Sequence, residues 1–220
     1  MTAAGAARAE YPAVSDRTTL SARVPTGLAL ACHPATPCAA VQGVRAGWHW
    51  YPRDGTPWLH LRYVVQVVQA DPHALRLPEA RAPRFADGLW RHTCFEAFVS
   101  APSGSAYHEF NFAPSGEWAA YGFSTERRRD AAADAPLARL ALAPATSQDG
   151  DVLALDASLP MAALPAAASG APWRLGLTAV IETRDGQLSY WALRHPAARP
   201  DFHHHGGWTA CVFPPPPHGT

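Results

Sequence analysis

Short apolar runs separated by turn residues are the feature of this 220-residue chain that most constrains its fold. The runs are rich in Val, Phe, Tyr, Trp and Thr, and clusters of Gly, Pro, Asp and Ser lie between them. Runs of this length and composition are typical of β-strands. The candidate strands are 38–50, 58–69, 92–100, 106–113, 117–123, 138–145, 151–159, 172–183, 187–193 and 207–213.

About ten strands with little helix predict an all-β protein, either a sandwich or a barrel. Two alanine-rich segments, 129–136 and 161–169, are each expected to hold only a turn or two of helix, because a proline interrupts both. The Arg-Asp-Gly segment at 184–186 separates two apolar runs. It predicts a hairpin with glycine at the position that needs a positive φ.

The chain has the length of one domain. Residues 1–26 are small, polar and aperiodic, and we expect them to form a disordered lead. Residues 27–213 hold the strand-like runs and are expected to form one β-sandwich domain. Residues 214–220 form a proline-rich tail, which cannot continue a strand.

Charge and hydropathy exclude several classes of partner. The 18 basic and 18 acidic residues balance, so no global field attracts nucleic acid or an acidic membrane surface. No apolar run approaches the roughly 20 residues of a membrane-spanning helix. The apolar stretch 24–32 contains Pro and Gly, so we expect a first strand there and not a signal peptide, which favours a cytoplasmic location. The arginines at 127–129 predict a solvated loop.

Two neighbouring candidate strands in the middle of the chain carry acidic residues among apolar ones. Side chains alternate between the two faces of a strand, so each strand divides into two sets. The phenylalanines at 95, 110 and 112 belong to sets that must face the same core, which fixes the parity of the pairing. Four polar side chains then share the other face: Glu96, Tyr107, Glu109 and Asn111.

Two like charges on one sheet face destabilise it, by a fraction of about 1 kcal/mol when exposed and by more when buried. The pair therefore needs a cation, an arginine, a shared proton or a hydrogen-bonding ligand. One interpretation is two solvated glutamates bridged by Arg62 or Arg91. The nearby aromatic residues Trp90, Trp118 and Tyr121 favour a binding surface, because sugar recognition requires aromatic faces beside acids and amides.

Three strings in the sequence resemble a known family. They are LWRHTCFEAFV (89–99), YHEFNFAPSGEWAAYGF (107–123) and PDFHHHGGWTACVF (200–213). They resemble the bacterial DOMON-like proteins related to family 9 carbohydrate-binding modules, and LACHPATPCAAV (30–41) and LRLP (75–78) fit the same pattern. The likeness spans roughly residues 27–213. It implies an immunoglobulin-like antiparallel β-sandwich that binds a ligand and performs no chemistry itself.

The resemblance also implies a site for a small carbohydrate or the end of a glycan. In the sugar-binding relatives, tryptophans clamp a sugar ring while acidic, amide and basic side chains hold its hydroxyls. Trp90 would be one wall of the clamp, and either Trp191 or Trp208 the other. The hydroxyl partners would be Glu96, Glu109 and Asn111, with Tyr107 on the same face.

Two cofactors are possible by family analogy. Haem binds to some DOMON proteins through axial Met and His, and Met161 is the only methionine beyond Met1. Ligation by two histidines, from His92, His108 or the triplet at 203–205, stays open. Calcium would need 6 to 8 oxygen ligands, and no such set can be mapped onto the sequence.

A glycoside hydrolase is the alternative from another functional class. Cross-strand neighbours have Cβ atoms about 5 Å apart, and retaining glycosidases hold their carboxyls roughly 5 to 5.5 Å apart. Glu96 and Glu109 fit that spacing. However, no long loops build a cleft, and adjacent strand residues lie side by side instead of flanking a bond. The sequence therefore favours a non-catalytic binding domain.

Overall fold

The computed structural model describes residues 27–215, so the predictions for 1–26 and for 216–220 lie outside the described residues. Strands dominate this part of the chain, and its helices are short, the longest having seven residues. The strands are β1 (Leu28–Cys32), β2 (Val41–Arg53), β3 (Thr56–Val67), β4 (Arg84–Phe85), β5 (Cys94–Ser100), β6 (Tyr107–Phe112), β7 (Glu117–Thr125), β8 (Arg128–Arg129), β9 (Ala145–Asp149), β10 (Val152–Pro160), β11 (Trp173–Glu182), β12 (Leu188–Ala192) and β13 (Ala210–Val212). The helical turns are η1 (Leu89–Arg91), α2 (Ala131–Leu137), η2 (Met161–Ala163) and η3 (His205–Gly207).

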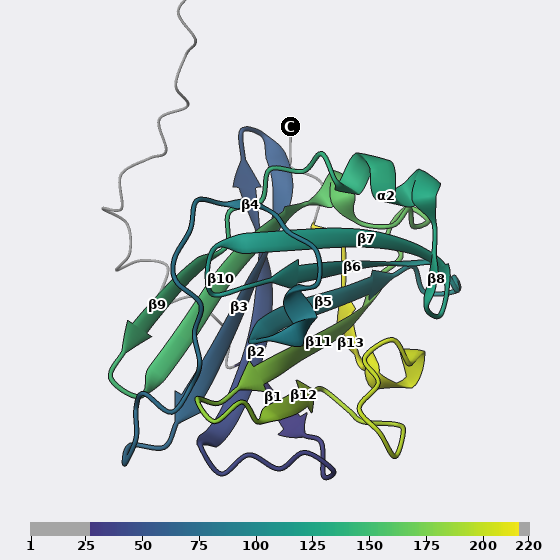
Figure 1. Ribbon diagram of the computed structural model, residues 1–220. Coiled ribbons are helices and arrows are strands. Elements are labelled where there is room, and N and C mark those ends of the chain that lie inside the picture. Colours follow the sequence, from purple (N-terminus) through teal and green to yellow (C-terminus); the bar gives the residue numbers. More distant parts are fainter. Residues whose placement is uncertain (1–26, 216–220) are drawn as a thin grey trace, which may run out of the picture.

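The strands form two sheets that pack face to face (Figure 1). The first sheet has the order β1-β2-β3-β10-β9. The second has the order β4-β7-β6-β5-β11-β12-β1, with β13 on β11 and β8 on β7. Strand β1 joins the sheets, because Leu28–Leu30 pair with β2 and Ala31–Cys32 pair with β12. The predicted all-β sandwich is confirmed, with β4 and β7 as a parallel pair in an otherwise antiparallel arrangement.

Alternating side chains fill the space between the sheets. Strand β3 contributes Leu61 and Tyr63, and the facing strands β5 and β6 contribute Phe95 and Phe110, all fully buried. The ring centroids of Tyr63 and Phe95 lie 5.2 Å apart. The Tyr63 hydroxyl donates to the backbone oxygen of Glu96 at 2.7 Å, which satisfies a polar group inside the core.

One predicted strand is wrong. Residues 138–144 form no strand, because α2 ends at Leu137 and the next strand begins only at Ala145. Leu142 is nevertheless buried in the core, and Leu140 packs against it. Their apolar spacing reflects that burial on an irregular path, and it does not reflect a sheet. The last predicted strand, 207–213, shortens to β13 because η3 occupies its start.

The turn predicted at 184–186 is confirmed. Gly186 has a φ of +84°, and its amide donates to Thr183 at 2.9 Å. The Thr183 amide donates to the oxygen of Gln187 at 3.0 Å, which closes the hairpin between β11 and β12. Glycine reaches this left-handed conformation without the steric cost that a side chain would add.

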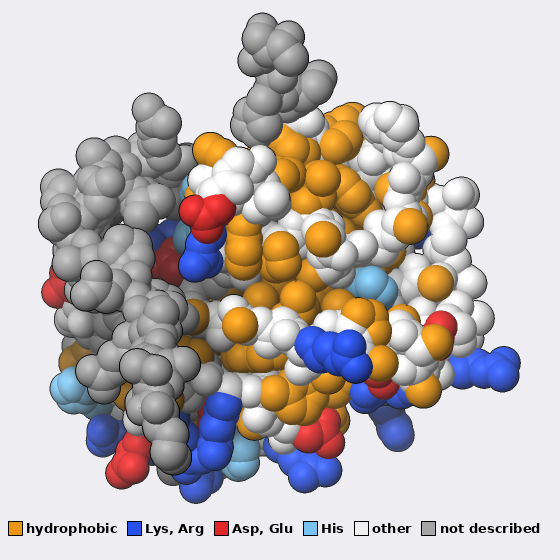
Figure 2. Space-filling model, turned by 90° about the horizontal axis from the view of Figure 1, so that it is seen from above, with side chains coloured by type: hydrophobic (Ala, Val, Ile, Leu, Met, Phe, Trp, Pro, Cys, Tyr) orange, Lys and Arg blue, Asp and Glu red, His pale blue; other side chains and the backbone are white. Residues whose placement is uncertain are grey.

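Figure 2 looks down on the end of the sandwich that carries α2. Hydrophobic side chains cover much of this face, and charged side chains lie mostly around its margin. The sequence of α2, AAADAPL, supplies small apolar residues to it. Among residues 27–215, no helix has both the length and the apolar character needed to cross a membrane.

Candidate functional site

The outer face of the second sheet carries the acidic residues singled out in the sequence. Phe95 and Phe110 point into the core, while Glu96 and Glu109 face the opposite side. The predicted parity is therefore confirmed. The register pairs Glu96 with Asn111 and Glu109 with Phe98, so the two glutamates are diagonal neighbours on adjacent strands.

A pocket of about 340 Å³ lies over these two glutamates. This volume is near the lower end of the range for small-molecule sites. Its floor comes from β5, β6 and β11, and its walls come from η1, β7, the turn before β8 and the segment 193–209 near the C-terminus. The residues that line it are Trp90, Glu96, Glu109, Tyr121, Phe123, Arg127, Arg129, Val180, Tyr190, Pro200, Phe202 and His203.

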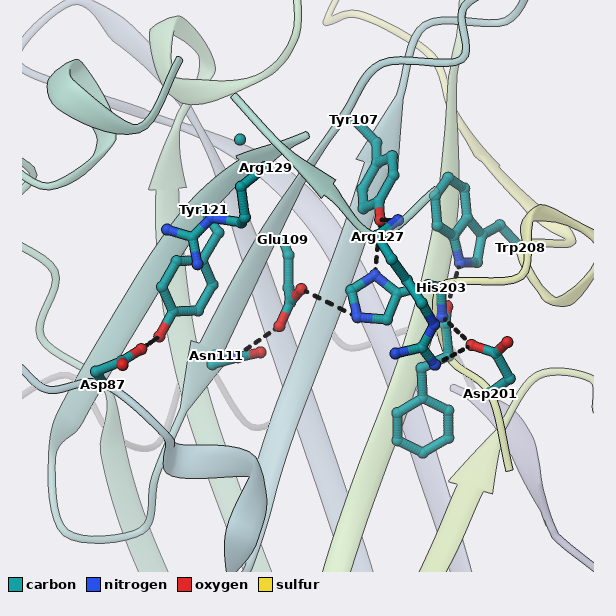
Figure 3. Close-up of polar contacts among 12 residues, drawn as sticks. Asp87, Tyr107, Glu109, Asn111, Tyr121, Arg127, Arg129, Asp201, His203 and Trp208 are labelled. Atoms are coloured by element: carbon teal, nitrogen blue, oxygen red, sulfur yellow. Dashed lines mark hydrogen bonds and ion pairs between the residues drawn. The ribbon is translucent and has the colours of Figure 1, made fainter. Parts of the chain in front are cut away.

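Glu109 lies among hydrogen-bonding groups from three parts of the chain (Figure 3). The Asn111 amide donates to its Oε1 at 2.8 Å, and Nε2 of His203 lies 3.7 Å from its Oε2. Nδ1 of His203 is 2.6 Å from the Tyr107 hydroxyl, which in turn accepts from the backbone amide of Arg127 at 3.1 Å. A chain of polar contacts thus links the C-terminal segment to the floor of the pocket.

Glu96 has no such support. It is 3% exposed, and among residues 27–215 its buried Oε1 has no hydrogen-bond partner. The same holds for Oδ1 of Asn111 and Oγ1 of Thr178, the cross-strand neighbours of Glu96 on either side. Buried polar atoms without partners are rare in folded proteins because leaving them unpaired costs about 1–3 kcal/mol each. Three such atoms thus lie in, or directly beside, the floor of the pocket.

Burial controls the protonation of both carboxyls. It raises the pKa of Glu96 well above the usual range, and the nearby Glu109 carboxylate raises it further. Burial also raises the pKa of Glu109 to about 7, against the opposing effects of the Asn111 hydrogen bond and the charges of Arg129 and Arg127. Burial thus opposes ionisation of both carboxyls, and only Glu109 has neighbouring groups that offset part of this effect.

Two arginines stand at the rim of the pocket. Arg127 donates to Asp201 at 2.7 Å, and Arg129 donates to Asp134 at 2.6 Å. The Arg129 guanidinium also lies 4.0 Å from the centre of the Tyr121 ring, a cation–π contact. The prediction of a solvated loop at 127–129 is thus only partly right, because two of its three arginines face the pocket.

The predicted tryptophans occupy three different environments. Trp90 is 38% exposed and lines the pocket, with its ring 5.8 Å from that of Tyr121 in an edge-to-face arrangement. Trp191 lies in the core between the sheets, where it donates to Ser189 at 3.0 Å. Trp208 is buried beside the pocket, stacked on Phe98, and it does not line the cavity.

Tyr107 and Asn111 lie beneath the pocket and act on it through the lining residues His203 and Glu109. The Tyr107 ring is fully buried against Phe123, and its hydroxyl orients His203. Asn111 is fully buried and holds Glu109. The structure thus brings Trp90, Glu96 and Glu109 to one cavity, places Tyr107, Asn111 and Trp208 beside or beneath it, and puts Trp191 in the core.

Several lining residues were not among those predicted. Tyr190 and Phe202 add aromatic wall, and His203 reaches the floor. The repeated histidines at 203–205 were the available signal, and their interpretation as a loop with one histidine bonded to a strand is confirmed at His203. Tyr190 lies on β12 next to the core residue Trp191, so strand alternation was the available signal for it. Phe202 could not be assigned, because its facing depends on how the segment 193–209 folds back onto the sheet.

The possible cofactors have no arrangement of ligands in the described part of the chain. Within residues 27–215, no three His, Cys, Asp or Glu side chains converge on a point that could hold a metal ion. Met161 packs against the core. His92 lies 2.8 Å from Glu182, and His108 donates to the oxygen of Ala163. Haem and calcium binding stay predictions from the resemblance.

Comparisons with known proteins identify the fold class. No protein-family model and no curated protein matches the chain. Among solved structures, a candidate carbohydrate-binding protein from Bacteroides uniformis superimposes with a TM-score of 0.57 at 14% identity, over 90% of each chain. The shared architecture confirms the β-sandwich fold. The narrower resemblance to DOMON-like proteins stays a prediction.

Two further structures show weaker similarity. Both are family 9 carbohydrate-binding modules from Caldicellulosiruptor kristjanssonii. The one in complex with cellotriose has a TM-score of 0.41 at 9% identity and covers 74% of this chain and 72% of that chain. The one in complex with glucose has a TM-score of 0.46 at 8% identity and covers 87% of this chain and 82% of that chain.

Proposed function

We propose that this chain is a non-catalytic carbohydrate-binding domain that holds a small sugar in the pocket above Glu96 and Glu109. The observation that carries the proposal is the combination of a floor with unpartnered buried polar atoms and walls with aromatic rings. A sugar presents both complementary surfaces, because its CH groups pack on rings while its hydroxyls take directed hydrogen bonds.

The position of Trp90 supports this role. It is one of the few exposed large aromatic residues, and η1 holds it at the mouth of the pocket beside Tyr121. Tyr190 and Phe202 form aromatic wall nearby and lie 5.8 Å apart between ring centroids. We assign Trp90 as the stacking surface and these two rings as the further aromatic wall, in place of Trp191 and Trp208.

The arrangement of the carboxyls favours binding over hydrolysis. Glu96 and Glu109 lie diagonally on adjacent strands of one sheet face, so both approach a bound sugar from the same side. A retaining glycosidase needs an acid and a nucleophile that flank the scissile bond. The fold shared with the candidate carbohydrate-binding protein from Bacteroides uniformis is consistent with the same role.

Isothermal titration calorimetry tests the proposal directly. We expect at least one of glucose, galactose, mannose, cellobiose and lactose to bind. Trp90→Ala and Glu109→Ala should each weaken that binding roughly tenfold or more, through loss of the stacking surface and of a charged hydrogen-bond acceptor. Trp58→Ala is the matched control, because Trp58 lies on β3 of the other sheet.

Two results would contradict the proposal. One is the absence of binding by every sugar of the panel, or binding that is unchanged in both site variants. The other would contradict only the statement that the domain is non-catalytic. Turnover of aryl glycosides by the wild-type protein that disappears in Glu96→Gln would show that the carboxyl pair performs chemistry.

A further inference from the structure

We propose that the floor of the pocket binds a single hydroxyl group of a neutral sugar between Glu96, which acts as the hydrogen-bond donor, and Glu109, which acts as the acceptor. This inference rests on the proposed function and narrows the ligand class. The buried position would accept a hydroxyl and reject an ammonium or a carboxylate there. It follows from the hydrogen bonds around the Glu109 carboxyl (Figure 3) and from the absence of a partner for the buried Oε1 of Glu96 among residues 27–215.

The Tyr107 hydroxyl determines the direction of the hydrogen bonds that lead to Glu109. Its hydroxyl oxygen accepts from the backbone amide of Arg127 at 3.1 Å, and that amide can only donate. The one proton of the hydroxyl is then available to Nδ1 of His203, 2.6 Å away. Burial lowers the pKa of His203 to about 4, so the imidazole is neutral at pH 7 and carries one proton. That proton must be on Nε2.

Glu109 consequently faces donors on both of its oxygens. The Asn111 amide donates to Oε1 at 2.8 Å, and the N–H at Nε2 of His203 points from 3.7 Å towards Oε2. A carboxylate accepts at every lone pair, whereas a protonated carboxyl would direct its own O–H against one of these donors. The donors around Glu109 therefore favour its ionised, accepting form and offset part of the cost of its burial.

Glu96 has the opposite surroundings. No donor in residues 27–215 reaches its buried Oε1, so nothing there stabilises a negative charge. The carboxylate of Glu109 lies diagonally across the strand pair and repels a second charge. Glu96 therefore holds the single proton of the pair and presents an O–H to the pocket.

One donor beside one acceptor matches the chemistry of a hydroxyl group, which donates one hydrogen bond and accepts others. An ammonium cannot accept from Glu96, and a carboxylate cannot donate to Glu109. The guanidinium groups of Arg127 and Arg129 line the same pocket, and their positive charges further disfavour an ammonium.

Infrared spectroscopy in D₂O at pH 8 tests the protonation of the pair without any ligand. We expect one carbonyl stretching band of a protonated carboxyl group in the wild-type protein. The band should be absent in Glu96→Gln and present in Glu109→Gln. A band that disappears only in Glu109→Gln, or no band in the wild-type protein, would overturn the assignment of donor and acceptor.

Calorimetry with sugar analogues tests the hydroxyl itself. For each of glucose, galactose and mannose that binds, its monodeoxy analogues are titrated, together with the amino analogue and the sugar acid at the sensitive carbon. One monodeoxy analogue should bind roughly ten- to a hundredfold more weakly, because both carboxyls lose their partner. The amino analogue and the sugar acid should lose at least as much.

Two variants separate the roles of the carboxyls. Glu96→Gln keeps an N–H donor at the same place, so sugar affinity should change by less than about threefold. Glu109→Gln replaces a charged acceptor by a neutral one and should cost at least about tenfold. Equal losses in the two variants, or the reverse order, would contradict the inference.

The outcomes also distinguish this inference from the proposed function. A hexose that binds while all of its monodeoxy analogues bind equally well would overturn the hydroxyl bridge alone. An amino analogue that binds as tightly as the hexose would do the same. Failure of every sugar of the panel to bind would overturn the proposed function. The infrared band would then test the protonation of the two carboxyls independently of any ligand.

Discussion

Buried glutamates in this protein differ in what surrounds them, and this difference assigns them to different roles. Glu117 is 8% exposed and receives hydrogen bonds from Arg84 at 2.6 and 2.9 Å. Its Oε2 also accepts from Ser115, and the Arg84 hydrogen bond lowers its pKa. Glu96 is equally buried but has an oxygen without a partner. Glu117 therefore stabilises the fold, whereas the burial of Glu96 lowers the free energy of unfolding.

Amide substitutions should shift stability in opposite directions at these two residues. At pH 8 the unfolded chain ionises Glu96 freely, while the folded protein must keep a proton on it or bury a charge. Glu96→Gln should therefore raise the free energy of unfolding by about 1–2 kcal/mol. Glu117→Gln should lower it by a similar amount, because the arginines lose a charged partner.

Urea unfolding of the two variants and the wild-type protein at pH 8 measures this difference. A lower stability for Glu96→Gln than for the wild-type protein would mean that the ionised carboxyl is the favoured form. That outcome would also contradict the assignment of Glu96 as a hydrogen-bond donor.

At the scale of elements, the segment 193–209 completes the site by folding onto the second sheet. Arg174 of β11 donates to the backbone oxygen of His205 at 2.7 Å, and the Trp208 indole donates to Phe202 at 2.8 Å. The indole packs directly over Gly176 of β11, where a Cβ atom would come within 2.2 Å of its ring. The absence of a side chain at Gly176 thus leaves the space that the Trp208 ring occupies.

A methyl group at Gly176 should displace the segment. Gly176→Ala is expected to lower the free energy of unfolding by roughly 1–3 kcal/mol, because the Trp208 indole must move away from the new methyl group. It should also weaken sugar binding, because His203 and Phe202 belong to the displaced segment. Near-ultraviolet circular dichroism of the protein reports the change in tryptophan packing. Urea unfolding measures the loss of stability, and calorimetry measures the weaker sugar binding.

Gly43→Ala is the matched control for this experiment. Gly43 also lies in a strand, β2, but a Cβ atom there would have no neighbour within 4 Å. The free energy of unfolding of Gly43→Ala should stay within about 0.5 kcal/mol of the wild-type value. Equal effects of the two substitutions would show that glycine in a strand, and not the contact with Trp208, determines the result.

The long connection between β3 and η1 is the other element that builds the site. Arg76 donates to Glu182 at 2.9 Å, Arg84 donates to Glu117, and the Tyr121 hydroxyl donates to Asp87. These three contacts tie the connection to the second sheet on the way to Trp90. The exposed tryptophan at the mouth of the pocket is therefore held by polar contacts at several points along its loop.

For the whole molecule, the buried carboxyls link stability to pH. A carboxyl whose pKa is raised by folding binds more protons in the folded state, so its contribution to stability is lost as pH rises through the folded pKa. For Glu109 this window extends from about 4.5 in the unfolded chain to about 7 in the folded protein. Other ionisable and polar groups that face it are Glu96, Tyr107, Asn111, Tyr121, Asp87, Arg127, Arg129 and His203.

The lowered pKa of His203 acts in the opposite sense, because its contribution is lost as pH falls from 6.5 towards 4. Comparison with a variant isolates the carboxyl from the histidine. Relative to the wild-type protein, Glu109→Gln should gain on the order of a few kcal/mol in stability between pH 4.5 and pH 8. A stability difference between the two proteins that is independent of pH, measured by urea unfolding across this range, would contradict the raised pKa.

Sequence reasoning was most successful where the signal is local. The alternation of Glu96 and Glu109 with Phe95 and Phe110 depends only on the two-residue period of a strand, and it predicted the polar face. The failure at 138–145 has the same origin, because Leu140 and Leu142 supply the two-residue spacing of a strand without a partner strand. A local pattern reports burial, but it does not report pairing.

The sequence by itself therefore determined the all-β class, the parity of the central strands and the placement of two glutamates on one face. The tertiary structure alone decided which distant segments meet above them. It placed Trp191 in the core opposite Ala179 of β11, and it brought His203 and Arg127 to the floor and rim of the pocket. The reason is physical: side-chain alternation is set within each strand, whereas the walls of the pocket depend on packing between segments up to a hundred or so residues apart.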